Sequence, residues 1–214
     1  MNGKVELVLD ARAEVGESPI WHAQRQVLYW VDILKCQVHI YNPATKRDRA
    51  IHVGQFVGTV VPRKAGGVMV ALQRGFARLD LNTEMLDFIA DPEADKPGNR
   101  FNDGKCDPAG RFWAGTMPIE GAEPTGSLYC LHANLTVKKM LSPVTCSNGI
   151  AWSLDKKTMY YIDTPRMIVD AFDYDLATGN IANRRTAITI PPGIGSPDGS
   201  TLDAEGMLWI AHWG

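Results

Sequence analysis

The chain has 214 residues, of which 45% are apolar and 21% are charged, a composition typical of a soluble globular protein. Its net charge of −2 gives no electrostatic basis for binding nucleic acid or an anionic membrane surface. No apolar run approaches the roughly 18 residues that a membrane-spanning helix needs, so the sequence predicts neither a nucleic-acid nor a membrane partner.

The N-terminal residues 1–8 alternate between polar and apolar side chains, as a strand does, and lack the long apolar core of a signal peptide. We therefore expect a cytoplasmic protein. The four cysteines, Cys36, Cys106, Cys130 and Cys146, include no Cys-x-x-Cys pair, which argues against a structural zinc site. We expect four reduced, mostly buried thiols.

Five short aromatic or β-branched runs recur along the chain and predict strands. The steps between equivalent positions are 40, 44, 47 and 49 residues for Leu28, Val68, Phe112, Met159 and Leu208. Self-similarity at this period, with several short strands per unit, indicates a β-propeller. Helical repeats would need long 3.6-residue periodicity, and a generic β-sandwich does not predict the repeat.

Four of these units are complete, and the fifth contains its strand before the chain ends at Trp213-Gly214. We therefore expect a single domain over residues 1–214, a propeller that lacks the rest of its fifth blade and a sixth blade. Because each blade of a propeller packs between two neighbours, such an open ring should expose apolar faces and associate or partly unfold.

Glu17, Asn148 and Asp198 share one local context. Each is an acid or an amide beside glycine or proline, in a tight turn at the entry to a predicted inner strand. Inner strands line the central channel of a propeller, so these side chains should converge there. Two carboxylates and one amide oxygen, completed by waters, suit Ca²⁺, Mg²⁺ or Mn²⁺, and Zn²⁺ also accepts such ligands. Asn-Gly and Pro-Asp-Gly are also common turn formers, so each residue alone is compatible with a structural turn.

The densest polar cluster contains Arg100, Asn102 and Asp103. Arginine offers a rigid fork of donors, and asparagine offers both a donor and an acceptor, a combination suited to hydroxylated or carboxylated small molecules. A solvated hairpin loop is the alternative. Glu120, considered alone, is an exposed acid in the loop after residues 115–118. The chain has no Gly-x-Ser-x-Gly, Walker A or Gly-x-Gly-x-x-Gly motif, which argues against serine hydrolases, NTPases and dinucleotide enzymes.

At these residues the sequence resembles the gluconolactonase, regucalcin (senescence marker protein) and luciferin-regenerating enzyme family. The matching stretches are residues 16–21, 28–33, 99–105, 107–111, 114–117, 147–152 and 197–199. The resemblance implies an all-β, six-bladed β-propeller with one divalent metal ion in its channel, here truncated to four complete blades and part of a fifth.

The resemblance also assigns roles to individual residues. Glu17, Asn148 and Asp198 match the family's metal ligands, and Asp198 matches the proposed general base. Arg100 and Asn102 match substrate contacts, and the loop acid at position 120 matches a contact that varies among members. Family members hydrolyse sugar lactones to aldonic acids with calcium, zinc, manganese or magnesium.

The leading hypothesis is therefore metal-dependent hydrolysis of a small-molecule sugar lactone. A metal would polarise the carbonyl and activate a water, Asp198 would accept a proton, and Arg100 or Asn102 would hydrogen-bond the oxygen that becomes negative. The alternatives are a non-catalytic calcium-binding or protein-interaction propeller, and a propeller hydrolase that acts on aryl or phosphate esters.

Overall fold

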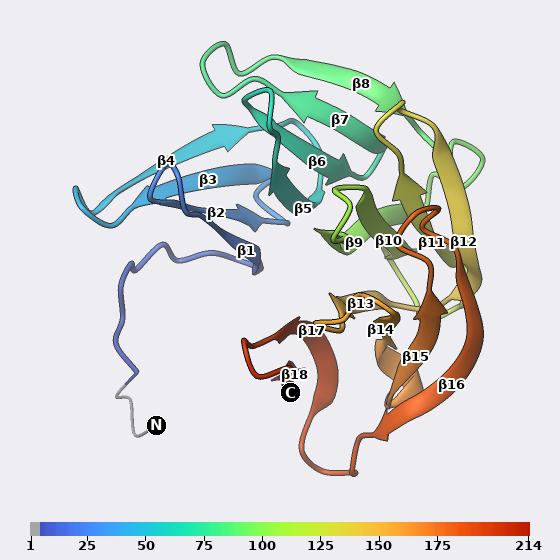
Figure 1. Cartoon of the computed structure of the whole chain (residues 1–214). Helices are drawn as coiled ribbons and strands as arrows, with labels where there is room; N and C mark the ends of the chain where they lie inside the picture. Colours follow the sequence, from blue (N-terminus) through green and yellow to red (C-terminus); the bar gives the residue numbers. More distant parts are fainter. Residues whose placement is uncertain (1–4) are drawn as a thin grey trace.

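The computed structural model describes residues 5–214, which form 18 β-strands and one short 3₁₀ helix, η1 (Thr164–Arg166). The strands make four four-stranded sheets and one two-stranded sheet, placed one after another along an arc (Figure 1). Strands that are consecutive in sequence are antiparallel neighbours within each sheet. This arrangement confirms the predicted all-β propeller, and we call the sheets blades 1 to 5 in chain order. Within the described residues, no helix is long and apolar enough to cross a membrane.

Within each blade the strands follow one another in sequence order from the centre of the arc to its rim. The innermost strands are β1 (Gly16–His22), β5 (Val57–Pro62), β9 (Asn99–Cys106), β13 (Ser147–Trp152) and β17 (Ser196–Leu202). The second strands are β2 (Val27–Asp32), β6 (Val68–Leu72), β10 (Phe112–Pro118), β14 (Thr158–Asp163) and β18 (Leu208–Trp213). The third strands are β3 (Gln37–Asn42), β7 (Gly75–Leu79), β11 (Gly126–Leu131) and β15 (Ile168–Tyr174). The outermost strands are β4 (Arg47–His52), β8 (Leu86–Ala90), β12 (Val137–Val144) and β16 (Ile181–Thr189). The five runs that repeat in the sequence are the second strands.

Apolar side chains from neighbouring blades share each core cluster. Phe76 of blade 2 packs against Phe101 of blade 3 with ring centroids 4.7 Å apart, and Trp113 of blade 3 meets Trp152 of blade 4 at 6.0 Å. Each fully buried side chain of this kind stabilises the fold by roughly 1.5–3 kcal/mol. Packing between blades therefore fixes the innermost strands relative to one another.

A buried polar network also joins blades 3 and 4. Oδ2 of Asp107 accepts hydrogen bonds from Arg111 Nε at 2.6 Å, from Trp113 Nε1 at 3.0 Å and from the Tyr174 hydroxyl at 2.7 Å. The Arg111 guanidinium also donates to two backbone carbonyls in the turn after β15. Every polar group of this network that enters the core thus has a partner, as buried charges require.

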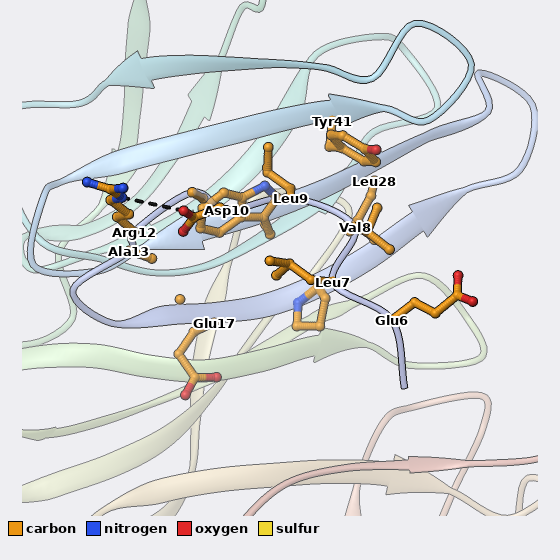
Figure 2. A pocket seen from close by; sticks show the side chains of 14 residues that line it. Glu6, Leu7, Val8, Leu9, Asp10, Arg12, Ala13, Glu17, Leu28 and Tyr41 are labelled. Atoms are coloured by element: carbon orange, nitrogen blue, oxygen red, sulfur yellow. Dashed lines mark hydrogen bonds and ion pairs between the residues drawn. The ribbon is translucent and has the colours of Figure 1, made fainter. Parts of the chain in front are cut away.

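The N-terminal segment does not form the strand that its alternation suggested. Residues 5–15 contain no strand, and residues 1–4 lie outside the described residues. Residues 6–13 run over blade 1 and, with side chains such as Leu28 and Tyr41, line an open pocket of about 470 Å³ (Figure 2). Glu17 lies at the edge of this pocket, and its carboxylate points away from the apolar side chains (Figure 2).

The four cysteines are free in the described part of the chain, but the expectation that most of them are buried is wrong. Cys130 is buried, whereas Cys36, Cys106 and Cys146 are half-buried. Burial raises the pKa of the Cys106 thiol to about 11, so this thiol stays protonated at neutral pH.

Candidate functional site

Every innermost strand carries one irregularity in its pairing, close to its start. In β1, two residues lie opposite one residue of β2 between the pairs Glu17–Val31 and Ile20–Tyr29. The same one-residue excess follows Val57 of β5, Phe101 of β9, Ser147 of β13 and Pro197 of β17. A β-bulge redirects the side chains beside it. Because the innermost strands surround one centre (Figure 1), the bulges direct residues of different blades towards the same region.

The three predicted metal-ligand residues lie at these bulges. Glu17, Asn148 and Asp198 are inside β1, β13 and β17, not in tight turns that precede the strands, so the predicted turns are wrong. Gly149 and Gly199, which suggested turns, lie within the bulges of β13 and β17 instead. A Cβ atom on Gly149 would lie 2.8 Å from the carbonyl oxygen of Asp198, so only glycine allows this approach of β13 to β17.

Three carboxylates, those of Glu17, Asp103 and Asp198, line one cavity of about 920 Å³ that extends along the innermost strands towards Trp21. Burial, followed by the negative charges of Asp198 and Asp103, raises the pKa of Glu17 to about 7. Burial also raises the pKa values of Asp103 and Asp198. Among residues 5–214, no lysine or arginine forms a salt bridge with any of the three. A proton or a bound cation would relieve the repulsion between these carboxylates.

The Asn148 side chain is buried and held by a short chain of hydrogen bonds. Its Nδ2 donates to Thr164 Oγ1 at 2.9 Å, and Thr164 Oγ1 donates to the carbonyl oxygen of Pro197 at 2.9 Å. The Cys146 sulfur lies 3.9 Å from Nδ2. In the described part of the chain, no donor is hydrogen-bonded to Asn148 Oδ1.

Arg100 and Asn102 are bound to each other beside the carboxylates. Arg100 Nη1 donates to Asn102 Oδ1 at 2.8 Å and to the Phe101 carbonyl at 3.0 Å, and Asn102 Nδ2 donates to the Ser147 carbonyl at 2.8 Å. Burial lowers the pKa of Arg100, and the positive charge of this guanidinium offsets a small part of the rise in the pKa of Glu17. Asn102 therefore orients the guanidinium and ties β9 to β13.

Glu120 stands apart from this group. It is exposed in the loop after β10, and within residues 5–214 it makes no hydrogen bond or salt bridge. Its predicted contact with substrate remains a prediction.

Sequence reasoning missed three groups at this site. Asp103 was noted as a polar residue without a role, and Lys105 and Thr164 were not identified. Lys105 Nζ donates to the Ser200 carbonyl of β17 at 2.6 Å, and burial lowers its pKa. The run from Asn99 to Gly104, which the sequence suggested as a polar turn or hairpin loop, lies in strand β9, and residues two apart in a strand lie on the same face, so both Asp103 and Lys105 reach the cavity. Thr164 lies 16 residues from Asn148 in η1, and no sequence pattern links the two.

Among residues 5–214, no group of three or more His, Cys, Asp or Glu side chains could hold a metal ion. The candidate set is of a different composition, because it combines the carboxylates of Glu17 and Asp198 with the amide of Asn148. Such mixed oxygen ligands are common for hard cations.

One family model and several known proteins are similar to this chain over most of its length. Residues 15–214 match the family model described as SMP-30/Gluconolactonase/LRE-like region. Regucalcin of Xenopus laevis is 42% identical over 213 residues, which cover 97% of this chain and 71% of that protein. The Bacillus subtilis protein named "Putative sugar lactone lactonase YvrE" is 38% identical over 208 residues, with the same coverage of both chains. The structure of a calcium-binding protein, regucalcin, from Agrobacterium tumefaciens has a TM-score of 0.90 and 30% identity, over 94% of this chain and 68% of that one.

Proposed function

This chain belongs to the SMP-30/gluconolactonase/LRE-like family, and from that premise we propose that it hydrolyses a sugar lactone to the aldonic acid with one divalent metal ion. The similarity to a protein named as a sugar lactone lactonase supports the choice of substrate class. The observation that carries the proposal is the convergence of Glu17, Asn148 and Asp198 at bulges of three innermost strands, beside the guanidinium of Arg100.

The residues at this place fit a hard divalent cation. Glu17 and Asp198 supply carboxylate oxygens whose pKa values are raised by burial, and Glu17 is further raised by neighbouring negative charge. The Asn148 oxygen adds a neutral ligand that no described protein donor occupies. Oxygen donors of this kind suit Ca²⁺, Mg²⁺ and Mn²⁺, and Zn²⁺ accepts them as well.

The side chains of the site divide the chemistry of lactone hydrolysis between them. The carboxylate form of Asp198 takes a proton from the attacking water, and because burial raises its pKa, this carboxylate is a stronger base than an exposed one. Arg100 donates hydrogen bonds to the oxygen on which negative charge develops, while Asn102 holds the guanidinium in place. A divalent cation, when bound, polarises a carbonyl group and makes a nearby water more acidic. No covalent nucleophile is needed.

Acid release from a panel of sugar lactones tests the proposal. We expect release above the spontaneous rate, loss of that excess after chelation, and its return when a divalent cation is added. Asp198→Asn should abolish the excess, while Glu205→Gln, an exposed turn acid outside the site, should retain it. Excess acid release that persists in Asp198→Asn and after chelation would refute the metal-dependent mechanism.

The same preparation separates the alternatives. Cation binding without turnover of any lactone would favour a non-catalytic calcium-binding or protein-interaction propeller, a possibility supported by the similarity to a calcium-binding protein. Turnover of aryl or phosphate esters instead of lactones would favour a different hydrolase.

A further inference from the structure

We propose that Thr164 is a positioning residue that sets the orientation of the Asn148 amide, so that its oxygen and not its NH₂ group is left free for a cation. The inference rests on the proposed function, because it concerns a residue that would hold the metal. The side-chain oxygen and nitrogen of asparagine are nearly identical in shape, so packing alone does not choose between the two orientations.

The directions of the two hydrogen bonds at the Thr164 hydroxyl determine which end of the Asn148 amide faces it. A threonine hydroxyl has one proton, and Thr164 Oγ1 gives it to the carbonyl oxygen of Pro197 at 2.9 Å. The carbonyl cannot donate, so the hydroxyl can only accept from Asn148. At a separation of 2.9 Å the group that faces Thr164 must therefore be the NH₂ group. The Cys146 sulfur, a weak acceptor, lies on the same side of the amide at 3.9 Å.

The hydroxyl is itself held in a fixed place. Thr164 is the first residue of η1, directly after β14, and its backbone nitrogen donates to the Cys146 carbonyl at 3.1 Å. Cys146 lies two residues before Asn148, and Pro197 directly precedes Asp198. One threonine side chain thus connects the strands that carry two of the proposed ligands. Without this hydroxyl, the NH₂ group of Asn148 loses its acceptor at 2.9 Å, and the Cys146 sulfur and the Asp198 carboxylate, which also interacts with the Asn148 side chain, are the acceptors that remain. The preference for the orientation with the oxygen towards the cation is then weakened.

The test compares Thr164→Val, which keeps the shape of the side chain but lacks the hydroxyl, with Thr164→Ser, which keeps the hydroxyl. Calorimetric titration with Ca²⁺ should show affinity weakened about 10- to 100-fold in Thr164→Val, the usual effect of losing a partner of a metal ligand. Thr164→Ser should bind as the unmodified chain does. Thermal melts of the metal-free variants establish that each is folded.

An Asn148→Asp background distinguishes positioning from a general structural role. A carboxylate has two equivalent oxygens and needs no orientation, so Thr164→Val should leave Ca²⁺ affinity unchanged there. An equal loss in both backgrounds, or no loss in either, would overturn the inference.

A second measurement keeps the inference testable if the proposed function is wrong. Ca²⁺ binding without lactone turnover would refute the lactonase activity and leave the Thr164 result intact. If no cation binds, the side-chain ¹⁵NH₂ signal of Asn148, identified by its absence in Asn148→Asp, reports the hydrogen bond directly. We expect slow hydrogen exchange and a shift in Thr164→Val but not in Thr164→Ser. A signal unchanged by Thr164→Val would refute the proposed contact.

Discussion

Replacement of Asp107 by asparagine should destabilise this chain more than any exposed substitution of the same kind. The Asp107 carboxylate is 4% exposed and accepts hydrogen bonds from Arg111, Trp113 and Tyr174. An amide in its place leaves the Arg111 guanidinium without a counter-charge and points an NH₂ group at groups that are themselves donors. Breaking a buried ion pair on one side costs about 3–5 kcal/mol, a large share of the roughly 5–15 kcal/mol that stabilises a typical protein. For a chain of this size that corresponds to a decrease in Tm of about 6–20 °C.

Blade 5 provides the matched control. Asp203 accepts a hydrogen bond from Trp209 Nε1 at 2.8 Å and bonds from two backbone amides, but Asp203 is only half-buried and these hydrogen bonds are exposed to solvent. Asp203→Asn should therefore cost much less in a urea denaturation series followed by tryptophan fluorescence. Equal urea midpoints for Asp107→Asn and Asp203→Asn would refute the argument that burial of the charge determines how much stability is lost.

The pH dependence of the Asp107 network has a defined sign. Burial alone would raise the pKa of Asp107, but hydrogen bonds from Arg111 and Tyr174 outweigh it and hold the pKa below the usual value. The folded state therefore binds this proton less tightly than the unfolded state. The ionised Asp107 carboxylate therefore stabilises the folded state above its ordinary pKa of about 4, and this stabilisation is lost as the pH falls below that value. Asp107→Asn should accordingly lose less stability on acidification than the unmodified chain.

Three further predictions concern the site itself. Glu17→Ala, Asn148→Ala and Asp198→Ala should each abolish metal binding with little change in the circular dichroism spectrum, and full metal occupancy by elemental analysis would contradict the assignment. Arg100→Ala and Asn102→Ala should raise KM or lower kcat by roughly 10- to 150-fold, the loss expected for one charged hydrogen bond, while metal content is unchanged; unaltered kinetics on every lactone would count against both residues. Because the pKa of Glu17 is raised from 4.5 to about 7, the metal-free chain should lose stability as the pH rises between these values, and Ca²⁺ affinity should decrease below about pH 7. Denaturation and calorimetric titrations across this range, compared with Glu17→Gln, check both signs, and curves that coincide for the two proteins would show that another group titrates.

The blade pattern was predictable from sequence because each blade repeats the same local chemistry. An Asp-x-x-Gly turn followed by an aromatic strand is visible at Asp107–Trp113 and again at Asp203–Trp209, and both form the same hydrogen bond from indole to carboxylate. The metal-ligand candidates were found for the same reason, since they occupy equivalent positions of different blades.

The rest depends on pairing between strands, which a single sequence does not reveal. Gly149 next to Asn148 is equally compatible with a turn and with a bulge, and only the register with β14 distinguishes them. Thr164 acts across 16 residues through a side-chain contact, so neither periodicity nor spacing identifies it. The sequence also singles out Arg100 and Asn102 as candidates, but their mutual hydrogen bond, which leaves the Asn102 side chain occupied by the protein at both ends, follows only from the three-dimensional structure.

Blade 2 has the same bulge as the other blades but carries no side chain at the position that Glu17, Asn148 and Asp198 occupy in theirs. Its residue at the bulge is Gly58, where a Cβ atom would lie 2.4 Å from the carbonyl oxygens of both Phe101 and Asn102. Any larger residue at position 58 would collide with the backbone of β9, so a redesign cannot introduce an additional ligand at this position. A change of cation preference must instead come from exchanging donors at the bulges that already carry them. Because Glu17, Asn148 and Asp198 come from three different blades, each donor can be exchanged separately from the other two.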